Sequence, residues 1–450
     1  MTAHPHSAVA AVDEALAAIE AWNPIVNAMI TVTADGARER ARSLDAIAQS
    51  GETGPLQGMV INLKDCLDWV ATPTTAASVI LRDNWPARNA FITERLLAAG
   101  AILIGKANLH EWVFGPTSQS QHFGPVANPW NPARIPGGSS GGSGASVACG
   151  MARVSIGSDT AGSIRLPASY CGLAGLRPSI GRISRRGSIG VSAPFDAFGP
   201  MARSVADVAR VFAAIAGHDP EDPFSIDEPV PDVMREIDRS VRGMRIGVQR
   251  RWCFEELHPE LESAIERALQ IFRELGVEIV EVDLGDIERA QDMLAFRIVL
   301  ADAFALHRQQ LALRPQDYGK DLMVRYELGE RVSGAHYAEA LRWIETWRHR
   351  LRARFAEGVD AFLLPTTPGP APERVGLAYA QAIRAIPRFT SVFTAAGVPS
   401  LALPCGFSQM GLPLSLELSA AAMREATLLR LGHAFQQVTD HHLRSPSLPH

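Results

Sequence analysis

The sequence predicts an α/β fold with a large mixed, mostly parallel central sheet covered by helices on both faces. Short apolar runs alternate with helical patterns along most of the 450 residues. Hydrophobic residues make up 47% of the chain and charged residues 20%, which is ordinary for a globular protein with a large core. Because α/β folds can exceed the usual domain size without splitting, we expect one domain over residues 1–450.

The first 55 residues predict an N-terminal helical cap on this domain. Apolar residues recur at helical spacing over residues 12–22 and 34–49, and Asn23-Pro24 predicts a break between the two helices. A core segment of alternating strands and helices follows at 56–210, and residues 286–358 predict a mostly helical lobe. The expected strands lie at 59–63, 101–104, 154–157, 245–248, 278–282, 360–365 and 400–404, and the further helices at 93–99, 146–151, 261–275 and 425–438.

Charge and cysteine content exclude several classes of protein. The formal net charge is −5, and no run of Lys or Arg supplies the basic face that nucleic-acid binding needs. No apolar run reaches the ~18 residues of a membrane span. The five cysteines are odd in number and form no CxxC pair, which favours neither a disulfide framework nor a zinc site. We therefore expect a cytoplasmic protein with a small-molecule partner, no cofactor and no metal. A homodimer is an open alternative to a monomer.

Lysine is almost absent from the chain. Only Lys64, Lys106 and Lys320 occur among the 43 basic residues, so the other 40 are arginine. Arginine cannot be deprotonated in a protein, whereas a desolvated lysine can lose its proton and act as a base. This usage singles out Lys64 and Lys106, although chance survival of surface lysines is an open alternative.

Two glycine-rich stretches stand in the core segment. The first is Gly-Gly-Ser-Ser-Gly-Gly-Ser-Gly at 137–144, and the second is Gly-Ser-Asp-Thr-Ala-Gly-Ser-Ile-Arg at 157–165. The first lacks the Gly-Lys-Ser/Thr ending of a phosphate loop and the spacing of a dinucleotide fingerprint, so nucleotide binding is disfavoured. Apolar residues on both sides argue against a flexible linker.

Several motifs in order carry a family resemblance. They are Gly-Met-Val-Ile-Asn-Leu-Lys-Asp at 58–65, Gly-Lys-Ala-Asn-Leu-His-Glu at 105–111, Gly-Pro-Val-Ala-Asn-Pro-Trp at 124–130, and the two stretches above. With these the chain resembles the amidase signature family of Ser-cisSer-Lys amidases over residues 56–207. The resemblance implies the amidase signature fold. It also implies that Lys64 is the base, that Ser139 is a serine on a cis peptide bond, that Ser163 is the nucleophile, and that backbone N–H groups of Thr160, Ala161, Gly162 and Ser163 form the oxyanion hole.

The chemistry of these residues agrees with such a relay. A serine hydroxyl needs a base to become a nucleophile, and no His-Asp pair stands near these motifs. A lysine titrates near ~10.4 and must be buried among neutral groups to serve at pH 7, which the apolar run at 59–63 would provide. Asp65 would point to the opposite face of the strand and so have a structural role. Ser139 would then take the proton of Ser163 and pass its own to Lys64.

The remaining site residues are assigned supporting or binding roles. Ser140 is expected to support the serines by hydrogen bonds, and Asp159 and Arg165 to brace the loop as paired charges. By analogy with the variable positions of the family, the substrate pocket is expected to include Trp112, Phe114, Phe389 and Phe393. The alternative is that these aromatic residues belong to the ordinary core.

The function expected from these residues is that of a stand-alone amidase. It would cleave the C–N bonds of small linear amides, apolar or aromatic, through an acyl-enzyme, and could extend to carbamates, as a urethanase, to aryl acylamides and to esters. One alternative is the A subunit of a glutamine-dependent amidotransferase complex, which the motifs at 108–111, 118–120 and 128–130 resemble. Against this alternative, an acidic residue would be needed to hold the amino group of glutamine, and no Asp or Glu lies between Gln381 and Ser400. The other alternative is a non-catalytic binding protein on the same fold.

Overall fold

The computed structural model describes residues 7–51 and 53–448, and its centre is one 11-stranded sheet. The strand order is β1-β3-β2-β4-β6-β5-β10-β11-β9-β7-β8. The prediction of an α/β fold with a large mixed sheet is confirmed. The strands are β1 Met29–Val32, β2 Val60–Lys64, β3 Ile102–Ala107, β4 Val154–Asp159, β5 Ala174–Arg177, β6 Ala197–Ala202, β7 Arg245–Val248, β8 Glu278–Glu281, β9 Ala361–Pro365, β10 Ser400–Phe407 and β11 Pro413–Ala420.

The strands are parallel only toward the two ends of the sheet. β3, β2 and β4 run parallel at one end, and β9, β7 and β8 at the other. Every pairing between β4 and β9, and that of β1 with β3, is antiparallel, so the expected mostly parallel sheet is corrected to a mixed one. The reason lies in the connections. A five-residue turn joins β10 to β11, and no helix separates β5 from β6, so the chain turns back beside itself.

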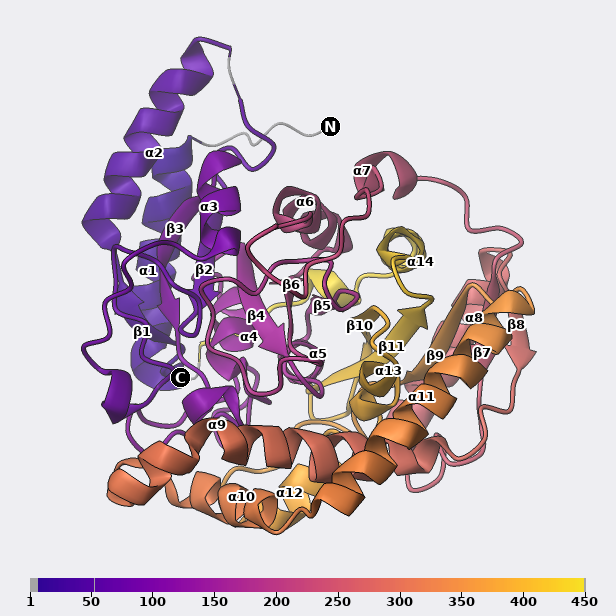
Figure 1. Ribbon diagram of the computed structural model, residues 1–450. Coiled ribbons are helices and arrows are strands. Elements are labelled where there is room, and N and C mark those ends of the chain that lie inside the picture. The colour runs from indigo at the N-terminus through magenta and orange to yellow at the C-terminus, as the bar shows by residue number, and fades with distance from the viewer. Residues whose placement is uncertain (1–6, 52, 449–450) are drawn as a thin grey trace.

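Helices cover both faces of the sheet (Figure 1). Leu401 and Leu403 of β10 contact α14 through Gly432, whereas the intervening Ala402 joins the cluster of α4 and α5 on the opposite face. The helices are α1 Ala8–Val26, α2 Ala34–Gln49, α3 Phe91–Ala98, α4 Gly141–Ala148, α5 Arg165–Cys171, α6 Val205–Ile215, α7 Val233–Glu236, α8 Pro259–Glu274, α9 Leu300–Leu313, α10 Lys320–Glu330, α11 Gly334–Ala356, α12 Tyr379–Ala385, α13 Thr390–Ala396 and α14 Glu425–Gln437, with a π-helix at Asp292–Val299.

The N-terminal helices lie beside the β1 edge of the sheet, and α9, α10 and α11 run along another side of the molecule (Figure 1). α1 continues through Pro24 to Val26, contrary to the break expected at Asn23-Pro24. A proline so close to the end of a helix removes one backbone donor and leaves only a short stretch of helix to be kinked. The helix instead ends at Asn27, whose φ of 51° is left-handed. In the described part of the chain, no helix is both long and apolar enough to span a membrane.

A buried ion network joins the two halves of the sheet. Arg165 of α5 lies 3.0 Å from Asp159 Oδ2 at the end of β4 and 2.7 Å from Glu417 Oε1 on β11. Arg177 Nε lies 3.3 Å from Asp159 Oδ1, and all four side chains are at most 1% exposed. Burial alone would raise the pKa of Asp159, but the two guanidinium groups outweigh it and hold that pKa below its usual value.

We expect Arg165→Met to lower the free energy of unfolding by about 3–5 kcal/mol, because it leaves the buried Glu417 carboxylate without an ion-pair partner and Asp159 with Arg177 alone. Urea denaturation followed by circular dichroism measures this loss. The matched control is Arg38→Met, which breaks an exposed ion pair with Asp13 and should cost under about 1 kcal/mol. Equal losses in the two variants would show that the network contributes no more than a surface pair.

Candidate active site

Lys64 lies at the end of β2 with its side chain fully buried. Its Nζ donates to Ser139 Oγ at 2.6 Å and to Ser158 Oγ at 2.8 Å. The next residue, Asp65, points the other way and pairs with Lys106 Nζ at 2.7 Å. Strand alternation therefore keeps the nearest carboxylate away from Lys64 and gives it to the other buried lysine.

Burial lowers the pKa of Lys64 from 10.5 to about 8, against the opposing influence of Cys66, Asp159 and Asp196. With that value, roughly a tenth of the side chains are neutral at pH 7, and the neutral form predominates above pH 8. The side chain can therefore accept a proton at a pH where an exposed lysine could not.

Ser139 precedes α4, and the peptide bond Gly138–Ser139 is cis. Its carbonyl oxygen accepts hydrogen bonds from the backbone N–H of His110 at 2.9 Å and from Ser118 Oγ at 3.2 Å. The loop that carries these two residues thus holds the backbone of Ser139 while its hydroxyl faces Lys64.

Ser163 lines a small cavity of about 50 Å³. Within the described residues no group is hydrogen-bonded to its hydroxyl, which leaves the oxygen available to a substrate. The carbonyl of Ser163 accepts from the Ser140 N–H at 3.3 Å, and Ser140 Oγ in turn bonds the backbone of Ser158. Ser140 therefore joins the loop of Ser163 to the loop of Ser139.

Three of the four expected oxyanion donors remain available. The Gly162 N–H donates to Asp159 Oδ1 at 2.7 Å and is occupied inside the loop. Thr160, Ala161 and Ser163 line the cavity, and their N–H groups have no acceptor among the residues described. Gly162 has φ of 133°, and a Cβ there would lie 2.4 Å from Thr390 Oγ1, so this position requires glycine.

Asp159 and Arg165 lie behind the loop, fully buried and outside the cavity lining. Asp159 accepts the N–H groups of Gly162 and Ile164, while Arg165 also donates to the backbone of Thr390. The two charges thus brace the turn that presents Ser163.

The expected pocket residues separate into three places. Phe114 lines the cavity beside Ser163, whereas Trp112 lines a neighbouring cavity of about 570 Å³. Phe389 and Phe393 are corrected to core residues: both are fully buried, with Phe389 edge-on to Trp252 and Phe393 stacked on Phe362. Sequence could not separate these cases because an aromatic side chain suits a core and a pocket equally well.

Arg325 of α10 is a functional candidate that sequence reasoning missed. It lines the same cavity as Ser163, with its guanidinium carbon 3.7 Å from the centroid of the Phe114 ring. No described carboxylate forms an ion pair with it, and its buried Nε has no hydrogen-bond partner. In a chain with 40 arginines no sequence signal marks this one; only the packing of α10 brings it to the site.

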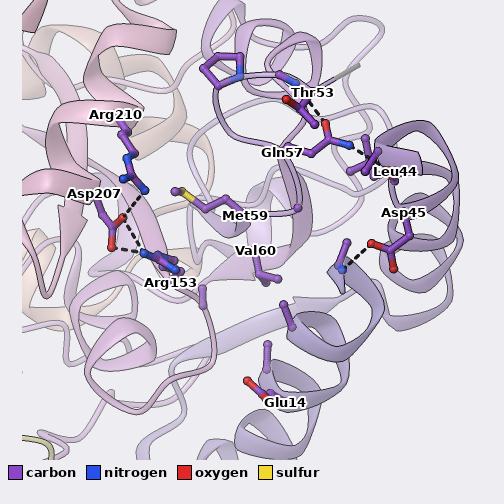
Figure 2. A pocket seen from close by; sticks show the side chains of 18 of the residues that line it. Glu14, Leu44, Asp45, Thr53, Gln57, Met59, Val60, Arg153, Asp207 and Arg210 are labelled. Atoms are coloured by element: carbon purple, nitrogen blue, oxygen red, sulfur yellow. Dashed lines mark hydrogen bonds and ion pairs between the residues drawn. The ribbon is translucent and has the colours of Figure 1, made fainter. Parts of the chain in front are cut away.

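A much larger cavity lies elsewhere in the described chain. It measures about 1070 Å³ and lies between the N-terminal helices and α6. Figure 2 shows Arg153, Asp207 and Arg210 on one side of it and Glu14 and Asp45 on the other. None of the relay residues lines it, so size alone does not mark the site.

Comparison with known proteins agrees with this arrangement. A family model described as Amidase matches residues 10–429. The chain belongs to the amidase signature family. As a member it is an amidase-type hydrolase. The A subunit of glutamyl-tRNA(Gln) amidotransferase from Roseiflexus sp. (strain RS-1) is 38% identical over 465 residues, which cover 97% of this chain and 94% of that protein.

Solved structures share the fold over nearly the whole chain. One is a vestigial protein complex that bears on the evolutionary origins of an s-triazine catabolic enzyme; it matches with a TM-score of 0.90 at 35% identity, covering 96% of this chain and 95% of that one. Another is the A subunit of glutamyl-tRNA(Gln) amidotransferase from Thermotoga maritima, with a TM-score of 0.86 at 26% identity, covering 98% and 95%.

The prediction of a stand-alone hydrolase of small apolar or aromatic amides is wrong. Curated relatives at 36–38% identity over nearly their full length are named as the A subunit of glutamyl-tRNA(Gln) amidotransferase. That prediction rested on aromatic pocket residues, two of which lie in the core, and on the absence of a carboxylate between residues 381 and 400.

We expect kcat/KM for an amide to rise with pH and to level off above an apparent pKa of about 8, because Lys64 must be neutral to accept a proton. Lys64→Met should lower kcat by at least ~10²-fold. Lys64→Arg should be equally impaired, since arginine keeps the charge and cannot lose its proton. A pH–rate profile from pH 6 to 10 measures this rise in kcat/KM. Near wild-type turnover in Lys64→Arg would exclude Lys64 as the base.

Proposed function

We propose that this protein is the amide-hydrolysing A subunit of a glutamine-dependent amidotransferase complex. The observation that carries the proposal is its similarity, at 36–38% identity over nearly the full length, to proteins named as the A subunit of glutamyl-tRNA(Gln) amidotransferase. The site supports it, because Lys64 donates to Ser139 at 2.6 Å and Ser163 lines a cavity together with Thr160 and Ala161. Partner subunits would receive the released ammonia. The protein would therefore have protein partners as well as the small-molecule substrate expected from the sequence.

The proposed reaction begins with neutral Lys64. It accepts the hydroxyl proton of Ser139, Ser139 accepts that of Ser163, and the Ser163 oxygen attacks the carboxamide carbon. The N–H groups of Ala161 and Ser163 stabilise the oxyanion. The proton returns through Ser139 to the leaving nitrogen, and ammonia departs from an acyl-Ser163 enzyme. Water then attacks the ester with the same relay as base and releases the carboxylic acid.

We propose that Arg325 binds the carboxylate of the substrate. A partly buried guanidinium without an ion-pair partner is stabilised when it binds a carboxylate, and its planar donors match that group. The ring of Phe114 stacks against one face of the guanidinium, and Arg325 lines the cavity. Glutamine supplies a carboxylate at one end and the scissile carboxamide at the other.

A second candidate substrate is an amide that bears a carboxylate and no ammonium group. The cavity lining contains Arg325 and no Asp or Glu that would neutralise an α-amino group. Pro387, which belongs to the segment 381–400 that contains no Asp or Glu, also lines the cavity. We also propose a cytoplasmic location, which all five free, buried cysteines favour.

We expect Ser163→Ala to lose at least ~10³-fold in glutamine hydrolysis while still co-purifying with the same partner subunits, because only the nucleophile is removed. Affinity purification of the full chain from its own cells, followed by an ammonia assay, measures both properties. Hydrolysis of aryl carbamates in preference to glutamine, by a chain that purifies alone, would contradict the proposal.

The two candidate substrates differ by one group. Glutaramate is glutamine without its α-amino group, so the ratio of their kcat/KM values reports whether the site accepts an ammonium. A preference for glutaramate of ~10-fold or more would favour the second candidate, as expected if a buried ammonium finds no acidic partner. A preference for glutamine would favour the first.

A further inference from the structure

The position of Arg325 depends on how the first turn of α10 is held. Three side chains of the loop over residues 110–121 contact that turn. Glu111 Oε2 accepts the Gly319 N–H at 2.9 Å, and Gln121 Oε1 accepts the Lys320 N–H at 3.2 Å. Asp321 Oδ2 lies 2.7 Å from His110 Nε2. The loop therefore anchors the helix at the end that precedes Arg325.

His110 contacts both the relay and α10. Its ring is buried, and Nδ1 accepts the backbone N–H of Ser118 at 3.1 Å, which assigns the ring proton to Nε2, the atom that lies 2.7 Å from Asp321 Oδ2. Its backbone N–H donates to the Ser139 carbonyl at 2.9 Å. A Cβ on Gly115 would overlap the ring at 2.2–2.4 Å, so the loop is shaped around this histidine.

Asp321 and Arg325 stand four residues apart and so share one face of α10. Fixing the Asp321 carboxylate therefore sets the rotation of the turn that carries Arg325. The guanidinium of Arg325 rests on Phe114, which belongs to the same loop as His110. One loop thus holds Ser139, Asp321 and Arg325 in a fixed relation.

We propose that His110 and Asp321 are a positioning pair that sets the distance between the serine relay and Arg325, and thereby selects amides with a carboxylate at that distance. The inference rests on the proposed carboxylate-binding role of Arg325. Neither residue touches the reacting atoms. Loss of the pair removes one of the three contacts that hold the first turn of α10, which weakens carboxylate binding more than the chemistry at Ser163.

The test compares two amides of equal length in the full chain, purified with the subunits that accompany it. Glutaramate carries the carboxylate, and 5-methylhexanamide carries an isopropyl group in its place. We expect Asp321→Ala to raise the KM for glutaramate ~10-fold or more and that for 5-methylhexanamide less than ~3-fold. Asp321→Asn keeps an oxygen acceptor for His110 Nε2–H and should recover most of the loss.

Two controls separate positioning from general damage. Asp317→Ala breaks an ion pair with Arg314 in the same lobe, at 2.6 Å, without touching the loop, and should change neither KM by more than ~2-fold. In an Arg325→Gln background, Asp321→Ala should add no further loss for glutaramate. Equal losses for the two amides would overturn the inference, because a structural role alone would affect both.

Binding of glutarate, measured by calorimetry, separates failure of this inference from failure of the proposed function. If the wild type hydrolyses neither amide nor glutamine but binds glutarate, and Asp321→Ala and Arg325→Gln each weaken that binding, the proposed function fails and the positioning pair stands. The inference would be overturned if Asp321→Ala bound glutarate as tightly as the wild type does. It would also be overturned if the wild type did not bind glutarate.

Discussion

The buried ion network around Asp159 is the constraint on which the rest of the structure depends. Its carboxylate forms ion pairs with Arg165 and Arg177 and accepts hydrogen bonds from the N–H groups of Gly162 and Ile164. Through Arg165 it reaches Glu417 on β11. The turn that presents Ser163 is therefore held by charges that also join the two halves of the sheet, so stability and site geometry share one set of contacts.

The same structure keeps charge away from Lys64. The pKa of Lys64 falls to about 8 because burial outweighs Asp159 and Asp196, which lie near without forming an ion pair with it. Asp65, the neighbour in sequence, is engaged by Lys106 and by Thr75. Two of the three lysines thus lie in adjacent strands in different settings: Lys106 pairs with Asp65, whereas Lys64 forms no ion pair with any described carboxylate.

The fold could be predicted to the level of its class and most of its parallel strands. The helix-strand alternation indicated β2, β3 and β4 and, later, β7, β8 and β9. β1, β5, β6 and β11 were not expected; irregular chain joins β5 to β6 and a short turn joins β10 to β11, so no helix marks these connections. The central antiparallel pairings follow from those connections, which local periodicity does not record.

The sequence by itself determined the family and the candidate catalytic residues, which are a lysine in a chain rich in arginine and two serines in glycine-rich loops. These depend on residue type and local spacing, which the chain carries directly. The tertiary structure alone decided which residues surround Ser163. It placed Phe389 and Phe393 in the core, engaged the Gly162 N–H with Asp159, and brought Arg325 from a helix 162 residues after Ser163 into the same cavity. Substrate recognition depends on such long-range packing, and local sequence patterns do not identify which distant residues pack together.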